Sequence, residues 1–364
     1  MDNLTFISTL EKRISEIKKN KLSFIFTIST TAKIEDNPYL TPTRKTNDFI
    51  VMGCVIFDKK MLLQILQIID GVSDIILVDQ EKKIPIKILE DDNEDKFIYT
   101  QGTIGSIDTG NFYKLAIKNI TKSKVYGFKP NDLTVDAIWS FLNHKNIFLN
   151  SCKICIIGAG NIGSKIALKV VECGANVAIF GRDNYKSSII ANGLNKIKAK
   201  STISNIECYD DIIKASFMSD ILICSTNGIS IIDANIIKTL KKNCIIIEVG
   251  KNNLQEEALI LATKKNMEIY RLDVTASLFG YIYSLLKTID ILDNSYGKNL
   301  IDEINFVSGG YFGAKGDIVT NNCYNPTEIY GEADGRGSLT QEIESNKRNK
   351  INKILQEINN NERI

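Results

Sequence analysis

The residues with the clearest chemical meaning are three glycines, Gly158, Gly160 and Gly163, in the spacing Gly-x-Gly-x-x-Gly. In such a turn the first glycine permits a tight bend, the second lets the backbone approach a pyrophosphate, and the third lets the next helix pack closely. Asn161 and Ile162 lie at the start of that helix, where unpaired N–H groups attract phosphate charge. The spacing predicts a dinucleotide-binding turn; the alternative is the same fold with an empty or repurposed crevice.

A second informative pair, Gly181 and Arg182, follows an apolar stretch at 177–180. In a dinucleotide-binding unit, an acid at this strand end binds the ribose 2′-hydroxyl and selects NAD. Glycine stands at that place here, and the neighbouring guanidinium could bind a 2′-phosphate bidentately. Asp183 could still reach a ribose or cap the next helix. The pattern favours NADP over NAD, and the alternative is that Arg182 is only an exposed turn residue.

Small polar residues follow two later apolar stretches. Ser225, Thr226 and Asn227 come after the first, and Gly250 and Lys251 come after the second. In open α/β sheets the carboxyl ends of the strands face the ligand. The first group could bind the nicotinamide ribose or form an ordinary turn. Gly250 permits close approach, and Lys251 is a candidate contact for substrate or phosphate.

These residues need an α/β fold to position them. The N-terminal half shows apolar strands at 48–57 and 74–79 around a helix at 59–70, which predicts a parallel strand–helix–strand unit. The later strands of the nucleotide-binding sheet are expected at 154–157, 177–180, 219–226, 242–250 and 267–271. We predict an N-terminal α/β substrate domain and a C-terminal doubly wound Rossmann domain. The divisions are 1–130 (substrate-binding domain), 131–148 (bridging helix), 149–275 (Rossmann domain) and 276–364 (return helix, Gly-rich segment and C-terminal helix).

The last of these regions contains a glycine-rich segment at 307–338. So long a loop-like stretch in a compact chain is either functional or disordered, and interspersed aromatic and β-branched residues favour order, as hairpins. It could be a lid over the site or an outer hairpin in a subunit interface. The C-terminal helix has Ile351, Leu355 and Ile358 on one face, to pack on the body or on a second subunit as a homodimer.

Composition excludes several classes of function. Lys plus Arg (45) nearly balance Asp plus Glu (43), so no electrostatic footprint for nucleic acid exists. No apolar run approaches the roughly 20 residues of a membrane span, and no signal peptide is recognisable. We therefore expect a cytoplasmic protein with a small-molecule substrate and neither a nucleic-acid nor a membrane partner.

The single histidine, His144, falls on the polar side of a predicted helix at 132–145, which argues against hydrolase triads. The chain has eight cysteines, and Cys152 and Cys155 have C-x-x-C spacing. We place this pair on a strand, where residues three apart point to opposite faces. No metal site is predicted, and the cysteines are interpreted as small buried hydrophobes. Those placed inside apolar elements are Cys173, Cys224 and Cys244.

The chain resembles the amino-acid-dehydrogenase-like superfamily, which includes shikimate dehydrogenase, methylene-tetrahydrofolate dehydrogenase and glutamyl-tRNA reductase. The resemblance covers residues 125–275 and extends to the N-terminal half only in outline. It implies a substrate domain, a bridging helix and a Rossmann domain in this order. The residues that carry it are Gly158 to Gly163, Gly181 with Arg182, Ser225 to Asn227, and Ile247 to Gly250.

The resemblance also suggests a catalytic pair. Shikimate dehydrogenases carry an Asn-x-Asp element that opens the bridging helix, and its Asp pairs with a catalytic Lys. Asp132 stands at a similar place, although Lys129-Pro-Asn131-Asp132 does not match the tripeptide and the family's Lys-bearing loop is not recognisable. We expect Lys129 and Asp132 to handle the proton; their alternatives are an exposed turn and a helix cap. Further candidates are Lys45 and Lys59 for the lysine, and, more weakly, Asp273 and Asp334.

The function that these observations predict is an NADP-dependent oxidoreductase. It would transfer a hydride to or from a carbonyl or imine of a small polar metabolite, in a cleft between the domains. Two alternatives remain. One is a lyase or cyclodeaminase that keeps NAD tightly bound, and the other is a non-catalytic NAD(P)-binding sensor or assembly protein.

Overall fold

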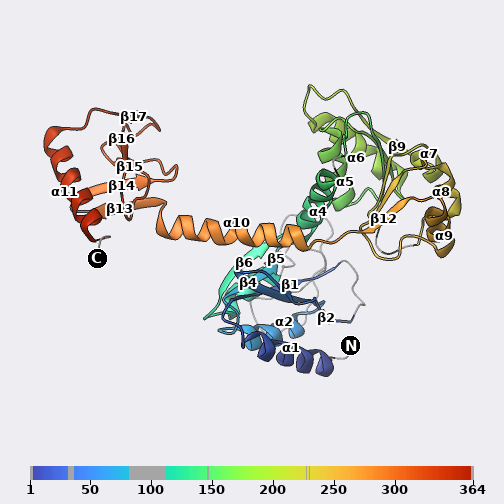
Figure 1. Cartoon of the computed structure of the whole chain (residues 1–364), viewed down its shortest axis with the longest axis horizontal. Coiled ribbons are helices and arrows are strands. Elements are labelled where there is room, and N and C mark those ends of the chain that lie inside the picture. Colours follow the sequence, from blue (N-terminus) through green and yellow to red (C-terminus); the bar gives the residue numbers. More distant parts are fainter. Residues whose placement is uncertain are drawn as a thin grey trace, which may run out of the picture. The chain divides into compact units, whose positions relative to one another are not determined.

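The computed structural model describes residues 3–31, 37–81, 112–145, 147–226, 228 and 230–361. The chain forms two compact units, Met1–Leu272 and Asp273–Ile364. The first unit contains two six-stranded sheets and the second a five-stranded sheet (Figure 1). The α/β fold class predicted from the sequence is confirmed.

The first sheet has the order β2-β4-β1-β5-β6, with β3 beside β4. Both strands of the predicted strand–helix–strand unit, β4 and β5, pair in parallel with β1 rather than with each other. The prediction of parallel strands is therefore right, but a strand for which no expectation was made lies between them. The bounds are β1 (Ser23–Ser29), β2 (Tyr39–Leu40), β3 (Arg44–Lys45), β4 (Phe49–Val55), β5 (Ile75–Asp79) and β6 (Lys124–Phe128).

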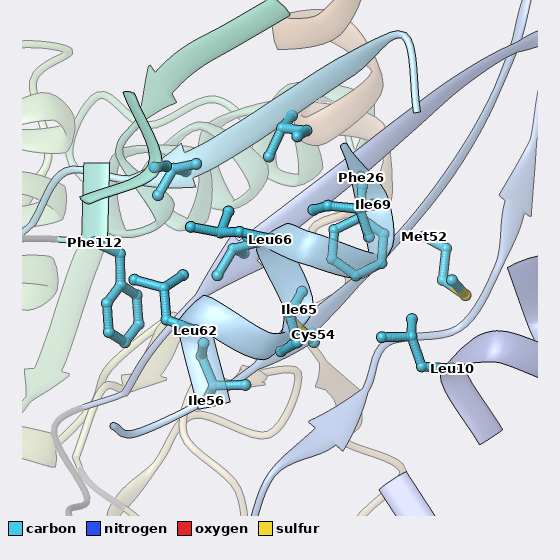
Figure 2. Packing of buried hydrophobic residues seen from close by; sticks show 14 of the residues in the cluster. Leu10, Phe26, Met52, Cys54, Ile56, Leu62, Ile65, Leu66, Ile69 and Phe112 are labelled. Carbon is cyan, nitrogen blue, oxygen red and sulfur yellow. The ribbon is translucent and has the colours of Figure 1, made fainter. Parts of the chain in front are cut away.

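Three helices cover one face of this sheet: α1 (Asn3–Ile17), α2 (Lys59–Ile69) and α3 (Phe112–Asn119). Helix α2 begins where the Asp58 carboxylate accepts the N–H of Met61 at 2.8 Å, and its apolar residues recur at helical spacing. Phe26 and Met52 point from the sheet into the same cluster as Leu62 and Ile65 (Figure 2). This apolar layer fixes the sheet whose carboxyl-terminal edge ends in Asp79 and Phe128.

A single carboxylate fastens the end of α2 to the turn before β6. Asp70 accepts backbone hydrogen bonds from Thr121, Lys122 and Ser123, at 3.1, 2.9 and 3.0 Å. Burial alone would raise the pKa of Asp70, but these N–H groups and the Thr121 hydroxyl lower the pKa to about 2. The ionised carboxylate therefore stabilises the fold.

We predict that Asp70→Asn lowers the free energy of unfolding at neutral pH, because the amide cannot accept the same set of bonds. Since the folded-state pKa of Asp70 is about 2 and the unfolded one about 4, its contribution is present above pH 4 and is lost as the pH falls toward 2. Urea unfolding at several pH values measures this, with Glu11→Gln on the exposed face of α1 as control. A variant with wild-type stability and wild-type acid dependence would contradict the assignment.

The second sheet is wholly parallel and has the order β12-β11-β10-β7-β8-β9. Numbered along the chain, its strands run 6-5-4-1-2-3, which is the doubly wound Rossmann order. The order reverses between β7 and β10, the first of which leads into the glycine turn. The strands are β7 (Lys153–Ile157), β8 (Asn176–Phe180), β9 (Ile206–Tyr209), β10 (Ile221–Cys224), β11 (Ile245–Glu248) and β12 (Glu268–Arg271).

Helices pack on both faces of this sheet. Alternate strand residues such as Ile154 and Ile156 face α4 and α5, and their neighbours Cys155 and Ile157 face α7, α8 and α9. The helices are α4 (Pro130–His144), α5 (Asn161–Val171), α6 (Asn184–Ile197), α7 (Ile212–Ser216), α8 (Ala234–Thr239) and α9 (Glu256–Lys264). The predicted bridging helix, α4, thus belongs to the Rossmann core.

The structure corrects three details of this region. Helix α4 has Lys129 at its N-cap position and Pro130 in its first turn, so the alternative interpretation of Asp132 as the helix cap is wrong. Cys173 is exposed just after α5 rather than inside an apolar element, and Cys152 lies just before β7 rather than on it.

Other predictions for this region are confirmed. His144 is exposed, as expected. Cys155, Cys224 and Cys244 are buried free thiols, and burial raises their pKa values.

The second unit begins with the 20-residue helix α10 and ends with α11, which covers one face of a small sheet. Hairpins occur as expected for the glycine-rich region, but β14 and β15 pair in parallel across a loop at 309–317. Phe306 and Ile318 pack against Ile351 and Ile354 of α11. The elements are α10 (Thr275–Asn294), β13 (Gly297–Ile301), β14 (Ile304–Ser308), β15 (Ile318–Thr320), β16 (Ile329–Ala333), β17 (Leu339–Thr340) and α11 (Ser345–Asn361).

Within the described ranges, every helix is too short or too polar to cross a membrane.

Candidate functional site

A pocket of about 260 Å³ opens at the carboxyl ends of β7, β8 and β10, where the strand order reverses. It brings together the three loops that the sequence singled out. Its lining includes the glycine turn from Gly158 to Gly160, the segment from Phe180 to Asp183, and Ser225 with Thr226; Ile157, Lys186, Ser187 and Ile231 complete it.

The glycine turn has the geometry that its spacing predicts. Gly158 has φ +109°, a conformation that favours glycine. A Cβ at Gly163 would lie 1.9 Å from the Gly158 carbonyl oxygen, so α5 can approach the turn only without a side chain there. A Cβ at Gly160 would meet no protein atom within 4 Å. The space beside Gly160 is therefore open to a ligand.

The first turn of α5 offers N–H groups to that space. Gly160 is its N-cap and no side chain caps the helix, so the N–H groups around Asn161 and Ile162 point toward the loop without a side-chain acceptor. Asn161 is exposed and Ile162 packs on the core. This arrangement suits a pyrophosphate.

The loop after β10 carries two hydroxyl groups, those of Ser225 and Thr226, in different surroundings. Ser225 Oγ donates to the Gly158 carbonyl at 2.9 Å, so this hydroxyl holds the glycine turn. Thr226 Oγ1 is buried without a hydrogen-bond partner in the part of the chain that is described, and Thr226 lines the pocket. A Cβ at Gly250 would lie 2.0 Å from the Thr226 carbonyl oxygen, so Gly250 lets the loops after β10 and β11 meet. Asn227 lies outside the described residues.

At the end of β8, two cations stand on the rim of the pocket. Arg182 and Lys186 are exposed, and neither forms an ion pair with a described residue. Asp183 caps α6 by accepting the N–H of Lys186 at 2.9 Å, which decides between its two predicted roles in favour of the cap. Gly181 is required by packing, since a Cβ would lie 2.2 Å from Ser187 Oγ.

Lys186 was missed in the sequence analysis. The available signal was its position in the first turn of the helix that directly follows Arg182, where its side chain turns back toward the strand end.

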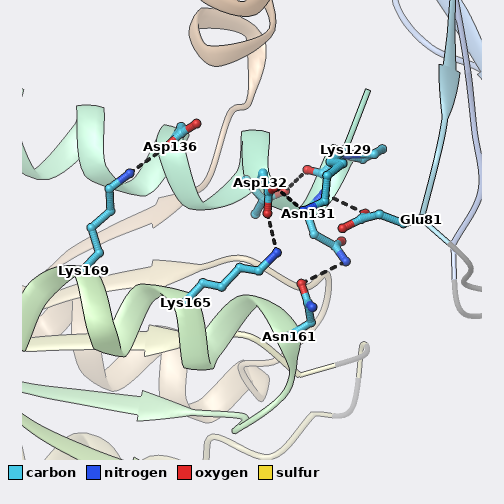
Figure 3. Close-up of polar contacts among 10 residues, drawn as sticks. Glu81, Lys129, Asn131, Asp132, Asp136, Asn161, Lys165 and Lys169 are labelled. Atoms are coloured by element: carbon cyan, nitrogen blue, oxygen red, sulfur yellow. Dashed lines mark hydrogen bonds and ion pairs between the residues drawn. The ribbon is translucent and has the colours of Figure 1, made fainter. Parts of the chain in front are cut away.

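The predicted pair Lys129 and Asp132 is in contact, with Lys129 Nζ 2.7 Å from Asp132 Oδ2 (Figure 3). A third group joins them: Lys165 of α5 pairs with the other carboxylate oxygen. The next turn repeats this link, with Lys169 Nζ 2.7 Å from Asp136 Oδ1. Asp132 therefore pairs with Lys129 and also forms one of two ion pairs that join α4 to α5.

These contacts set the protonation states of the pair. Partial burial alone would raise the pKa of Asp132, but the hydrogen bonds from Lys129 and Lys165 outweigh it and the pKa is lowered. The hydrogen bond to Asp132, with the charges of Asp132 and Glu81, raises the pKa of Lys129. At neutral pH the carboxylate is ionised and the lysine carries a proton that it can share.

The pair lies next to the glycine turn without lining the pocket. Asn131 Nδ2 is 3.4 Å from Asn161 Oδ1, and the Asn131 backbone N–H donates to Glu81 at 3.1 Å (Figure 3). Asn131 therefore contacts both the cofactor turn and the carboxyl-terminal edge of the first sheet.

The other candidates occupy different places. Lys45 lies opposite Ile50 at the amino end of β4 and bonds to Asn20, so it is on the wrong edge of the sheet for catalysis beside Asp132. Lys59 opens α2 at the correct edge. Lys251 lies 5.7 Å from the ring centre of Tyr39.

The two weaker acids are engaged in local turns. Asp273 accepts the N–H of Thr275, and Asp334 accepts the N–H groups of Arg336 and Ser338. Among the residues that the structure describes, no group of three or more His, Cys, Asp or Glu side chains could hold a metal ion.

Comparison with known proteins agrees with this geometry. Residues 135–278 match the family described as "D-isomer specific 2-hydroxyacid dehydrogenase, NAD binding domain". No curated protein sequence gives a significant match. The family match agrees with the Rossmann strand order of the second sheet, and both support the predicted resemblance to Rossmann dehydrogenases.

Three solved structures that this chain matches are described here by identity, coverage and TM-score. Glutamyl-tRNA reductase from Methanopyrus kandleri is 14% identical, with 44% of this chain and 41% of that chain covered and a TM-score of 0.33. A D-isomer specific 2-hydroxyacid dehydrogenase from Xanthobacter autotrophicus Py2 is 12% identical, with 44% and 59% covered and a TM-score of 0.29. A shikimate dehydrogenase solved with NADP⁺ is 14% identical, with 69% and 84% covered and a TM-score of 0.39. The chain spans less than half of the reductase, and none of these TM-scores reaches 0.5.

We predict that Lys165→Met raises the pKa of Asp132 toward its ordinary value, because one of two cations that favour the carboxylate is removed. Since the folded-state pKa of Asp132 is lowered, its contribution to stability is present above the unfolded pKa near 4 and fades as the pH falls. The variant should lose part of this acid dependence. NMR titration of the carboxyl carbon measures the pKa. Lys169→Met, one turn further along α5, is the control; an unchanged Asp132 pKa in Lys165→Met would refute the coupling.

Proposed function

We propose that the protein is an NADP-dependent oxidoreductase that transfers a hydride to or from a carbonyl or imine of a small polar metabolite. The observation that carries the proposal is the pocket at the reversal of strand order, with Arg182 and Lys186 on its rim and no acid at the tip of β8. We further propose that residues 1–130 bind the substrate and that 149–275 bind the cofactor, with the bridging helix at 131–148.

Three parts of the pocket support a dinucleotide as the ligand. The open space beside Gly160 and the first turn of α5 suit the pyrophosphate. Arg182 and Lys186 would bind the 2′-phosphate. The unpartnered hydroxyl of Thr226 would bond a ribose hydroxyl, since a buried polar atom without a partner is costly. When bound, the nicotinamide supplies the hydride chemistry.

The chain's own contribution is to orient the substrate and manage one proton. Lys129 is protonated at neutral pH because its neighbours raise its pKa, so it serves as a hydrogen-bond donor and proton source toward the substrate oxygen or nitrogen. Asp132 holds the ammonium group in place, and Lys165 keeps Asp132 ionised.

We predict that Arg182→Ala and Lys186→Ala each weaken NADPH binding about 10-fold to 100-fold, the usual range for a charge-assisted hydrogen bond. NADH binding should change little, because NADH lacks the 2′-phosphate. Fluorescence titration with both nucleotides measures the two affinities. Lys196→Ala, an exposed lysine in the last turn of α6, controls for net charge. Equal binding of NADPH and NADH by the unaltered protein would sink the phosphate-reading role.

We predict that Lys129→Met and Asp132→Asn each lower kcat about 100-fold or more, within the range of general acid catalysis, and leave the NADPH affinity unchanged. A screen of keto acids, shikimate-like compounds and imines for oxidation of NADPH identifies the substrate with which kcat is then measured. Asp132→Asn with full activity would remove this residue from the pair. If the protein binds NADPH but oxidises it with none of these substrates, the result would indicate a non-catalytic NAD(P)-binding protein. NAD that co-purifies and survives dialysis would instead indicate a lyase or cyclodeaminase.

A further inference from the structure

Helix α10 carries a second pattern, independent of the cofactor site. Leucine and isoleucine alternate along it at spacings of four and three residues. From Leu278 to Leu292 this matches two heptads of a coiled coil, with isoleucine at the a positions and leucine at the d positions; the a position before them is Thr275. The stripe consists of Leu278, Ile282, Leu285, Ile289 and Leu292.

The far half of this stripe is only partly covered by the residues that the structure describes. Ile282 is buried, but Leu285 and Ile289 are only half-buried and Leu292 is 55% exposed. No buried core cluster formed by described residues contains a residue of α10. A half-exposed Ile/Leu seam on a 20-residue helix is unusual for a soluble surface, where large apolar residues occur singly.

The pattern itself selects the partner. Isoleucine at a with leucine at d favours two parallel strands, because the branched side chains pack well only in that geometry. The positions that flank the seam allow a second copy to approach. In a parallel pair, Tyr281 would face Leu286 and Thr288 would face Asp293 of the other chain, so no like charges meet. The ion pair of Lys287 with Asp290, at 2.8 Å, lies on the outer face.

The size of the contact is sufficient for a reversible dimer. A 20-residue helix is about 30 Å long and about 10 Å wide. Two such helices side by side would bury on the order of 1,000 Å², the lower bound for a specific interface. Such an area suits association that depends on protein concentration rather than an obligate dimer.

We propose that the α10 seam is a homodimerisation surface, at which two copies of this chain pair in parallel through Leu285, Ile289 and Leu292.

Sedimentation velocity of the full chain over a wide concentration range tests the pairing. The unaltered protein should move from monomer to a species of twice the mass as its concentration rises. Ile289→Asp should keep it monomeric, because a charge would be buried in the seam. Ser284→Asp adds the same charge on an exposed position away from the seam and should dimerise as before. Circular dichroism and NADPH titration of each variant show that the fold is retained.

A cysteine at the end of the seam tests the direction. Leu292→Cys should form a disulfide between two copies under mild oxidation, because in a parallel pair residue 292 meets its own counterpart. Leu292→Ser is the control for the native cysteines. An unaltered protein that remains monomeric, a dimer that persists in Ile289→Asp, or no disulfide specific to Leu292→Cys would each overturn the proposal.

Discussion

The nucleotide-binding half of the molecule depends on the close contact around the Gly158 carbonyl. Gly163 of α5 approaches this oxygen so closely that a methyl group would stand 1.9 Å from it, and the Ser225 hydroxyl donates to it at 2.9 Å. One atom therefore joins the ends of β7 and β10 with the start of α5. Because the three segments meet there, the glycine turn and the loop after β10 are held together where both line the pocket. The position of Thr226, the residue after Ser225, follows from this contact.

Much of this half could be predicted because its signals are local. The glycine spacing predicts a turn and the start of a helix within a short stretch of sequence, and the structure confirms both. The structure adds a reason for Gly181 that the sequence could not provide, which is the packing of Ser187 beneath it. A glycine that suits a phosphate and a glycine that packs on a serine look the same in a sequence.

The less accessible features are those that join distant segments. Strand β1 is an apolar run typical of a buried strand, but its place between β4 and β5 depends on pairing with segments more than 20 residues away. Lys165 gives no signal in the sequence, because its partner Asp132 is 33 residues away and meets it only through the packing of α4 on α5. Asp132 was expected to pair with Lys129, which it does, but its second ion pair, across to α5, joins two segments that are distant in the sequence. Lys45 was a reasonable lysine by composition, but strand direction puts it at the other edge of the sheet.

The membership of α4 in the Rossmann core has a consequence for motion. Val135, Ile138 and Leu142 pack into the same cluster as the strands of the second sheet, and two ion pairs tie α4 to α5. Lys129 and Asp132 therefore travel with the glycine turn. The first sheet joins this assembly where β6 leads through Lys129 into α4, and there Glu81 accepts the Asn131 N–H. Any movement of the first sheet relative to the second would therefore leave the distance between Asp132 and the glycine turn unchanged.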